Sequence, residues 1–273
     1  MKKGFFLFAL CASVMMASAA SEITIATVVV NDEIAAMDNI ADTLNTIEGV
    51  TATGSITYDK NTKTLTLNEV TLTVSDKIYM LQTTAYAEGV TINLIGENTL
   101  ENTCDDYIEG IFCTNVPTNS LTITGEGSLN VYTKKWFPII LAGGSLTISN
   151  TKVVASNETK TRGIGNNSGA RGTLFLNKAA VITPDISSLS GISLTDCYLI
   201  QPVGAELLND EGYWSVDKKG STEDIVISPN KSSVETAIDN VSTQTRQTKY
   251  MLNGQLVIER DNKSYTVQGQ EVN

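Results

Sequence analysis

The chain has 273 residues, with 30 acidic against 19 basic side chains and no histidine. Its formal charge of −11 disfavours nucleic acids and anionic membranes as partners, because both repel an acidic surface. The missing histidine excludes catalysis by an imidazole base and zinc sites that need a histidine ligand, and with them most hydrolase templates.

Residues 1–19 have the composition of an export signal. Lys2 and Lys3 precede an apolar stretch, and Ala17-Ser18-Ala19 provides small residues for cleavage. The apolar stretch is too short to persist as a membrane helix, and no later stretch reaches the required length. We therefore predict cleavage after Ala19 and an exported protein that passes through the periplasm and is secreted or displayed on the cell surface.

Residues 20–50 are expected to form an N-terminal strand and a cap. Within this range the apolar residues fall at helical spacing; they are Ile34, Met37, Ile40, Ala41, Leu44 and Ile47. The spacing predicts one helix between Asn31 and Glu48 that covers the end of the next domain. The many Asp and Asn residues leave a turn-rich cap as the alternative.

An internal repeat organises residues 51–230. Four segments align without a gap: LTLNEVTL from Leu65, LTISNTKV from Leu146, LFLNKAAV from Leu174 and ISLTDCYL from Ile192. Each has aliphatic residues at the first, third and eighth places. Two further segments share this start but contain an inserted Gly-Glu pair: INLIGENTL from Ile92 and LTITGEGSL from Leu121. Successive starts lie 25 to 29 residues apart, except that the last step, to Ile192, is 18.

This repeat predicts an all-β fold, a parallel β-helix or solenoid. Units of about 20 to 30 residues with short strands and polar corners are typical of stacked coils around one aliphatic column. The break between the third and sixth places indicates a corner. A weaker series with a similar period supports this; it consists of Ile111, Ile140, Ile164 and Ile192. A β-sandwich is the alternative, although it does not require the same apolar pattern to recur at this period.

Five segments, in this order, resemble a family of secreted right-handed β-helix proteins of the Bacteroidetes, described as carbohydrate-binding domain-containing. The segments are ITYDKNTKTLTLNEVTL, INLIGENTL, LTITGEGSLNV, LTISNTKV and LTDCYLIQPVGAEL, and the similarity covers about residues 50–230. The resemblance implies a right-handed parallel β-helix and, as for some members, binding of plant-type or acidic polysaccharide. Because one fold supports many functions, the binding is an expectation only.

The C-terminal part departs from the repeat. Residues 231–248 are rich in Ser, Thr, Asn and Gln, which predicts a polar linker. In residues 249–273, Asn253-Gly254 and Asp261-Asn262 are turn signals between alternating apolar residues, and they predict a small three-stranded β-meander. This module resembles C-terminal type IX secretion modules, which implies that export machinery recognises it; a terminal cap is the alternative.

A glycan-binding site is predicted around an aromatic loop. Tyr132, Lys134, Lys135 and Trp136 lie together between two predicted strands, and Arg162 lies in a later loop. Aromatic rings stack against sugar rings, and cations attract anionic sugars. We therefore expect these residues to bind polysaccharide or a host or dietary glycan. The alternative is that Trp136 fills the interior of a coil.

Asp105, Asp106 and Glu109 are three carboxylates within five residues, and carboxylate oxygens are the ligands that Ca²⁺ prefers. They form a candidate metal site, with hydrated surface acids as the alternative; no other cofactor is expected. Cys104 and Cys113 flank the same loop, so they form a candidate disulfide in an oxidising compartment. The alternative is that the cysteines are small buried apolar residues.

Catalysis is not expected. Glycosidases of this architecture need carboxylates on both sides of the scissile bond, and Asp105-Asp106 is the only pair of adjacent aspartates. A lyase that acts on pectin is the less favoured alternative, with Arg162 and Arg171 as its candidate basic residues. We expect either a glycan-binding protein or an adhesin-like solenoid without a small ligand.

Overall fold

The computed structural model describes residues 23–83, 89–113, 119–166 and 169–230, and the backbone of four strands between residues 248 and 272. The export signal predicted for residues 1–19 lies outside the described residues, as does the predicted linker except for Thr248. The chain divides into two compact units, Met1–Pro229 and Asn230–Asn273. Among the described residues, no helix has the length and apolar character needed to cross a membrane.

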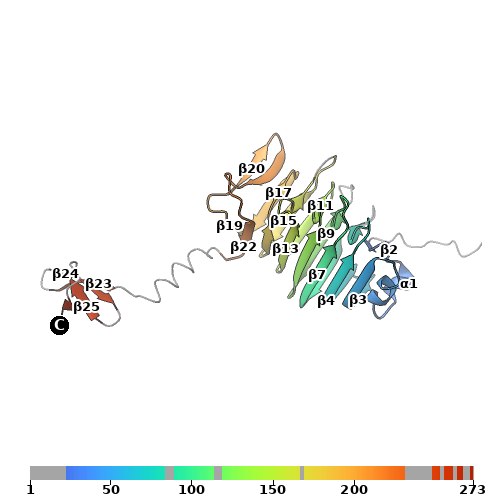
Figure 1. Ribbon diagram of the computed structural model, residues 1–273, viewed down its shortest axis with the longest axis horizontal. Helices are drawn as coiled ribbons and strands as arrows, with labels where there is room; N and C mark the ends of the chain where they lie inside the picture. Colours follow the sequence, from blue (N-terminus) through green and yellow to red (C-terminus); the bar gives the residue numbers. More distant parts are fainter. Residues whose placement is uncertain are drawn as a thin grey trace, which may run out of the picture. The chain divides into compact units, whose positions relative to one another are not determined.

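The first unit is a parallel β-solenoid of about four turns, so the predicted fold class is confirmed (Figure 1). Its strands form three stacks. Face 1 consists of the first half of β4 (Thr64–Val74), then β6 (Val90–Ile95), β9 (Ser120–Gly125), β12 (Ser145–Ser149), β15 (Thr173–Asn177) and β18 (Gly191–Thr195). Face 2 consists of the second half of β4, then β7 (Glu97–Asn102), β10 (Ser128–Thr133), β13 (Lys152–Asn157) and β16 (Ala180–Thr183). Face 3 consists of β5 (Leu81–Thr83), β8 (Ile111–Cys113), β11 (Ile139–Leu141), β14 (Ile164–Gly165) and β17 (Ile186–Ser187).

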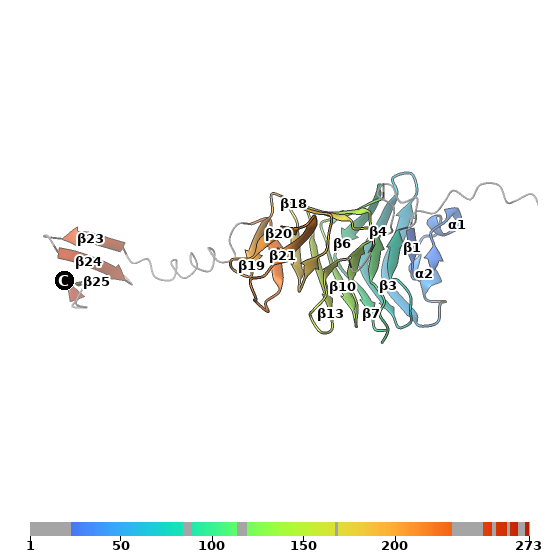
Figure 2. The ribbon, with the colours of Figure 1, turned by 90° about the horizontal axis from the view of Figure 1, so that it is seen from above.

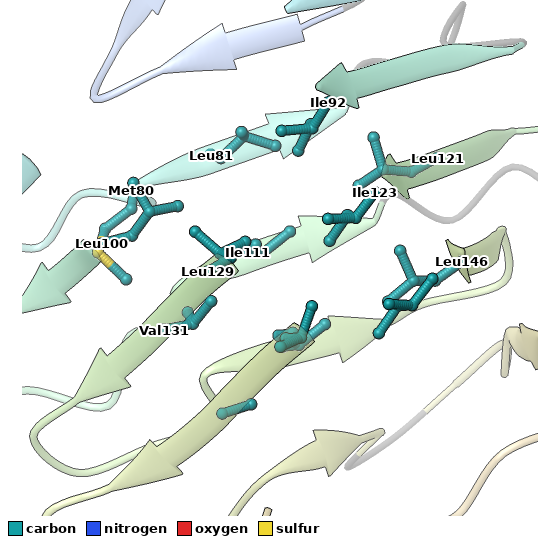
Figure 3. Packing of buried hydrophobic residues seen from close by; sticks show 14 of the residues in the cluster. Met80, Leu81, Ile92, Leu100, Ile111, Leu121, Ile123, Leu129, Val131 and Leu146 are labelled. Atoms are coloured by element: carbon teal, nitrogen blue, oxygen red, sulfur yellow. The ribbon is translucent and has the colours of Figure 1, made fainter. Parts of the chain in front are cut away.

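The core is one aliphatic column inside the three faces. Each core position predicted from the repeat is at most 2% exposed; these are Leu65, Leu67, Leu146, Ile148, Leu174 and Leu176. Leu146 pairs with Leu121 on one side and Leu174 on the other, in parallel register. Figure 3 shows how Ile92, Ile123 and Leu146, from consecutive coils, follow one another inside the solenoid. The parallel register excludes the sandwich alternative.

The corner between faces 1 and 2 lies at the fifth place of the repeat, where the sequence predicted a break. Glu69, Asn150, Lys178 and Asp196 occupy this place, with φ between 49° and 54°. A left-handed residue reverses the local bend of the strand, and it costs least for Asn, Asp or Gly. In the first of the two coils with a Gly-Glu insert, Gly96 occupies this place with φ 65°. Because of this bend, the inward position that follows the third place is the sixth place rather than the fifth.

Two register predictions are wrong. Leu121 pairs with Val90 rather than with Ile92, so β9 is shifted by two residues on β6. The shift places Gly125 against Leu94, where an added Cβ would lie 2.3 Å from the carbonyl oxygen of Leu94. Only glycine allows this approach of two backbones. The strands that contain the aligned motifs therefore do not all pair first place to first place.

The series predicted for face 3 also needs correction. Ile111 pairs with Ile139, not with Ile140, and Ile164 pairs with Ile186. Ile192 belongs to face 1, where it pairs with Leu174. The last coil is therefore truly shorter than the others.

The N-terminal end of the solenoid is covered by antiparallel strands and two short helices (Figure 2). The elements are β1 (Ile23–Ile25), β2 (Val28–Val29), α1 (Asp32–Ala35), α2 (Ala41–Leu44) and β3 (Val50–Asp59). The prediction of one continuous helix is wrong, and the turn-rich alternative is correct. Between the helices, the Oδ1 atom of Asn39 accepts hydrogen bonds from the backbone N–H groups of Ala41 and Ile56. These bonds hold a turn against β3 in place of helical continuity.

The C-terminal end is also covered by antiparallel strands. β22 (Ile225–Ser228) pairs with β16 and with β19 (Tyr198–Gln201), while β20 (Glu206–Asp210) and β21 (Tyr213–Asp217) form a hairpin. Trp214 exchanges two backbone hydrogen bonds with Leu189 at the end of the last coil. Trp214 thereby joins the hairpin to the end of the last coil.

The second unit is an antiparallel meander of β23 (Thr248–Leu252), β24 (Gln255–Arg260), β25 (Lys263–Thr266) and β26 (Glu271–Val272). Leu252 pairs with Gln255, and Arg260 pairs with Lys263, so the chain reverses where the two turn signals predicted. The meander has four strands rather than the predicted three. Gly269 lies between the last two strands in the sequence and was the available signal for a third turn.

Candidate functional site

The loops that join face 2 to face 3 lie next to one another along one edge of the solenoid. This loop edge consists of residues 75–80, 103–110, 134–138, 158–163 and 184–185. Backbone hydrogen bonds join the start of each of the middle loops to the strand one coil earlier. The backbone N–H of Lys134 donates to the backbone carbonyl oxygen of Asn102, and the backbone N–H of Glu158 donates to that of Thr133. Side chains from successive loops are thereby brought within contact distance.

A polar ladder holds these loops in place. The last inward residue of four strands on face 2 is polar and at most 1% exposed; these are Asn102, Thr133, Asn157 and Thr183. Thr133 pairs with Asn102 and with Asn157 in consecutive coils. A chain that turns out of a strand leaves backbone groups without sheet partners, and buried polar groups need hydrogen bonds. Side chains of the ladder meet that need.

Each ladder residue bonds to the backbone of a loop. The Oδ1 atom of Asn157 accepts from the N–H groups of Thr161 at 2.8 Å and Arg162 at 3.0 Å. The hydroxyl of Thr133 donates to the carbonyl oxygen of Trp136 at 2.6 Å. Asn102 accepts from the N–H of Cys104 at 2.9 Å. The ladder therefore positions the aromatic and basic residues of the loop edge.

An aromatic cluster lies in the middle of the loop edge. The ring centroid of Trp136 is 5.1 Å from that of Tyr107 and 5.5 Å from that of Phe137, both in edge-to-face geometry. The guanidinium carbon of Arg162 lies 5.5 Å from the Trp136 centroid and 4.9 Å from that of Phe137. The ammonium group of Lys135 lies 6.0 Å from the Tyr107 centroid. These distances are typical of cation–π contacts.

Three of the five residues predicted to bind glycan thus meet in this cluster: Lys135, Trp136 and Arg162. The sequence analysis missed Tyr107, which is 70% exposed and offers the most open ring of the cluster. An aromatic residue in the polar segment TCDDYIEG was the signal that could have found it. Its proximity to Trp136 depends on the stacking of loops, which one segment alone does not reveal.

The other two predicted residues have different surroundings. Tyr132 lies on the outer surface of β10, paired with Glu101 on the neighbouring strand. Desolvation raises the pKa of Tyr132, and the charges of Glu158 and Glu101 add to the shift. Lys134 forms an ion pair with Asp105 at 2.8 Å. The pair raises the pKa of Lys134 and lowers that of Asp105, so this lysine contributes little free positive charge to the cluster.

The predicted Ca²⁺ site is not formed. Asp105 is directed to Lys134, and Asp106 pairs with Lys77 at 3.0 Å. Burial raises the pKa of Glu109, although its hydrogen bond with Trp136 opposes the shift. Within the described ranges, no group of three acidic, cysteine or histidine side chains is arranged to hold a metal ion. Each carboxylate has its own partner: Asp106 has Lys77 in loop 75–80, while Asp105 and Glu109 have Lys134 and Trp136 in loop 134–138.

The predicted disulfide is not formed either. Cys104 and Cys113 are free and buried, as is Cys197. Cys104 lies two residues after the end of β7, where its backbone N–H donates to the Oδ1 atom of Asn102, whereas Cys113 ends β8 on face 3. The two thiols therefore occupy separate positions, and desolvation raises the pKa of Cys113 to about 12. The alternative interpretation, small buried apolar residues, describes them better.

The arginines proposed for a lyase lie against different rings. Arg162 covers Trp136 and Phe137, while the guanidinium carbon of Arg171 is 3.7 Å from the centroid of Tyr213 in the C-terminal hairpin.

Fold and site together define a parallel β-solenoid with an aromatic loop edge. No family model matches the chain, and neither a curated protein nor a solved structure does.

One acidic group at the loop edge has a testable pH dependence. Burial raises the pKa of Asp185, while the Ser187 hydroxyl, which donates to its Oδ2 atom at 2.6 Å, and the charges of Arg162 and Lys218 oppose the shift. A carboxyl with a raised folded-state pKa favours folding while it is protonated. This contribution is lost as pH rises from the unfolded-state pKa through the folded-state pKa.

Asp185→Asn should therefore raise the melting temperature at pH 7 and change it little at pH 3, where the carboxyl is already neutral. The Asn side chain retains an oxygen that can accept from Ser187. Thermal melts monitored by circular dichroism at the two pH values would measure the effect. Asp210→Asn, on exposed β20, is the control and should have little effect at either pH. An equal change at both pH values would contradict the prediction.

Proposed function

We propose that the protein is an exported, non-catalytic β-solenoid that binds glycan through its loop edge. The observation that supports this most directly is the open ring of Tyr107 beside Trp136 and Lys135. Export is proposed from the N-terminal leader and from the resemblance of the C-terminal module to secretion modules. The absence of histidine and the separation of the carboxylates support a non-catalytic role.

The chemistry of the loop edge suits a sugar ring. An exposed aromatic face stacks against the apolar face of a pyranose, and polar groups beside it bond to the hydroxyls. Tyr107 provides the ring, while Lys135 and Glu109 provide a donor and an acceptor in the same cluster. Ion pairs neutralise Lys77 and Lys134, so Lys135 and Arg162 are the cations left beside the rings. The edge therefore accommodates neutral or weakly acidic sugars.

The second candidate is an adhesin-like solenoid without a small ligand. The contact of Arg162 with both Trp136 and Phe137 favours it, because these rings then stabilise adjacent loops rather than face a ligand. The two candidates differ in what Tyr107 does. Glycan binding at the loop edge requires the Tyr107 ring, whereas a loop edge with only a structural role does not require it.

Tyr107→Ala is expected to lower glycan affinity by about fivefold, since loss of one stacking ring removes on the order of 1 kcal/mol. The measurement is a glycan array with the exported protein, followed by titration calorimetry on the best ligand. Tyr198→Ala is the control, because Tyr198 lies on β19 and is also partly exposed. Binding that survives Tyr107→Ala unchanged would remove the loop edge as the site, and an array without any binding would favour the adhesin-like candidate.

The C-terminal module is proposed to direct export. Deletion of residues 246–273 should leave the solenoid's melting temperature nearly unchanged, because the two units are separate compact bodies. The truncated protein should accumulate in the periplasm instead of reaching the surface. Fractionation of cells and immunoblotting would measure this. A large fall in melting temperature with normal delivery would show that the module is a structural cap.

A further inference from the structure

The outer surface of face 1 contains no charged residue on its strands, although the chain has 30 acidic and 19 basic side chains. On face 2, by contrast, Glu97, Glu101 and Lys152 face outward. Two columns of outward residues on face 1 cross all six strands in register. Column 1 is Thr64, Thr91, Thr122, Thr147, Phe175 and Ser193, and column 2 is Thr66, Asn93, Thr124, Ser149, Asn177 and Thr195.

Hydroxyl groups on this surface are available to a ligand. Within the part of the chain that the structure describes, the side chains of Thr122, Thr124 and Thr147 form no hydrogen bond. In the polar ladder, by contrast, the hydroxyls of Thr133 and Thr183 are bonded to backbone carbonyls. Outward hydroxyls without protein partners are free to bond to another molecule's hydroxyls in place of water.

An exposed ring lies within the same surface. Phe175 is 41% exposed and occupies column 1 between Thr147 and Ser193. A large apolar side chain on an otherwise hydroxyl-rich strand surface loses contact with water only if a ligand covers it. The combination of one aromatic face with rows of hydroxyl and amide groups is the chemistry that recognises sugars.

We propose that the outer surface of face 1 binds a neutral, extended polysaccharide that runs along the columns, across the strands. The lack of charge suits a ligand without charge. Neighbouring strands lie about 4.8 Å apart, which is close to the advance per sugar in an extended β-linked chain, so successive coils meet successive sugars. Six strands span about 24 Å, enough for roughly five sugars. This inference rests on the proposed glycan binding, and it adds a second surface and a class of ligand.

Affinity gel electrophoresis of the full-length exported protein tests the proposal, with hydroxyethylcellulose as the neutral polysaccharide and polygalacturonate as the acidic one. The double variant Thr122→Val and Thr147→Val removes two hydroxyls but retains β-branched side chains, so the strands should be preserved. It should weaken retention by hydroxyethylcellulose by at least fivefold, the effect of about one lost hydrogen bond. Phe175→Ala should weaken it similarly, and added salt should not.

Thr99→Val on β7 of face 2 is the matched control and should leave retention unchanged. Unchanged retention of the double variant and of Phe175→Ala would overturn the inference; a loss caused only by Tyr107→Ala would leave the proposed function intact. If Tyr107→Ala has no effect either, both proposals fail. Light scattering after size exclusion measures the oligomeric state of each variant. If the face 1 variants change the oligomeric state but not the retention, face 1 contacts a second copy of the chain, and the inference is overturned.

Discussion

Leu146→Ala is expected to lower the free energy of unfolding by about 2 to 5 kcal/mol, because it removes a buried aliphatic side chain and leaves a cavity. Leu146 is fully buried and stacks between Leu121 and Leu174 of the neighbouring coils. Close packing on both sides limits the collapse of the cavity, so the loss should lie in the upper part of the range. Denaturation by urea, monitored by circular dichroism, would measure it.

Thr147→Ala is the control for this change. Thr147 is the next residue of the same strand and faces outward, so its truncation should cost far less than that of Leu146. Equal losses for the two variants would contradict the inward and outward assignment of β12. They would also call the stacked column into question.

Asn157→Ala should lower the free energy of unfolding by about 1 to 3 kcal/mol, the cost of polar groups that lose their hydrogen-bond partner inside a protein. The variant removes the acceptor of two backbone N–H groups, those of Thr161 and Arg162. Release of Arg162 should also uncover the Trp136 ring that its guanidinium covers. Urea denaturation would measure the stability, and tryptophan emission should shift to longer wavelength.

Asn130→Ala provides the comparison for Asn157→Ala. Asn130 lies on the outer surface of β10, so its loss leaves no buried group unsatisfied. It should change neither stability nor tryptophan emission appreciably. If Asn157→Ala behaves like Asn130→Ala, water replaces the ladder bonds, and the ladder does not hold the loop edge.

Periodic burial made most of the solenoid predictable. The first and third places of the repeat identified core residues such as Leu65 and Leu174, because strand alternation and coil stacking both act on them. The register of β9 was not predictable from the motif, since it depends on the contact of Gly125 with the backbone of Leu94. Likewise, strands of two or three residues on face 3 contain too few positions to define a period.

The candidate site was predictable only where its residues lie close in sequence. Lys135 and Trp136 are adjacent, and their placement in a loop follows from the strands on either side. Tyr107 and Arg162 join them through the stacking of three loops, a long-range arrangement that no single segment reveals. The same stacking brings Lys134 next to Asp105. Carboxylates that are close in sequence are therefore paired with residues that are distant in sequence, and they do not form one site.

The parallel register has a consequence for how the chain acquires its structure. Paired residues lie about one coil apart in sequence: Leu121 and Leu146 are separated by 25 positions, and Leu146 and Leu174 by 28. Each new coil therefore needs only the coil before it as a template, and closing such a short segment costs little chain entropy. The strands β1 and β3, which cover the first coil, precede it in the sequence and are therefore synthesised before it. A chain that emerges N-terminus first can thus fold progressively, adding coils in the order of their emergence, without waiting for its C-terminal residues.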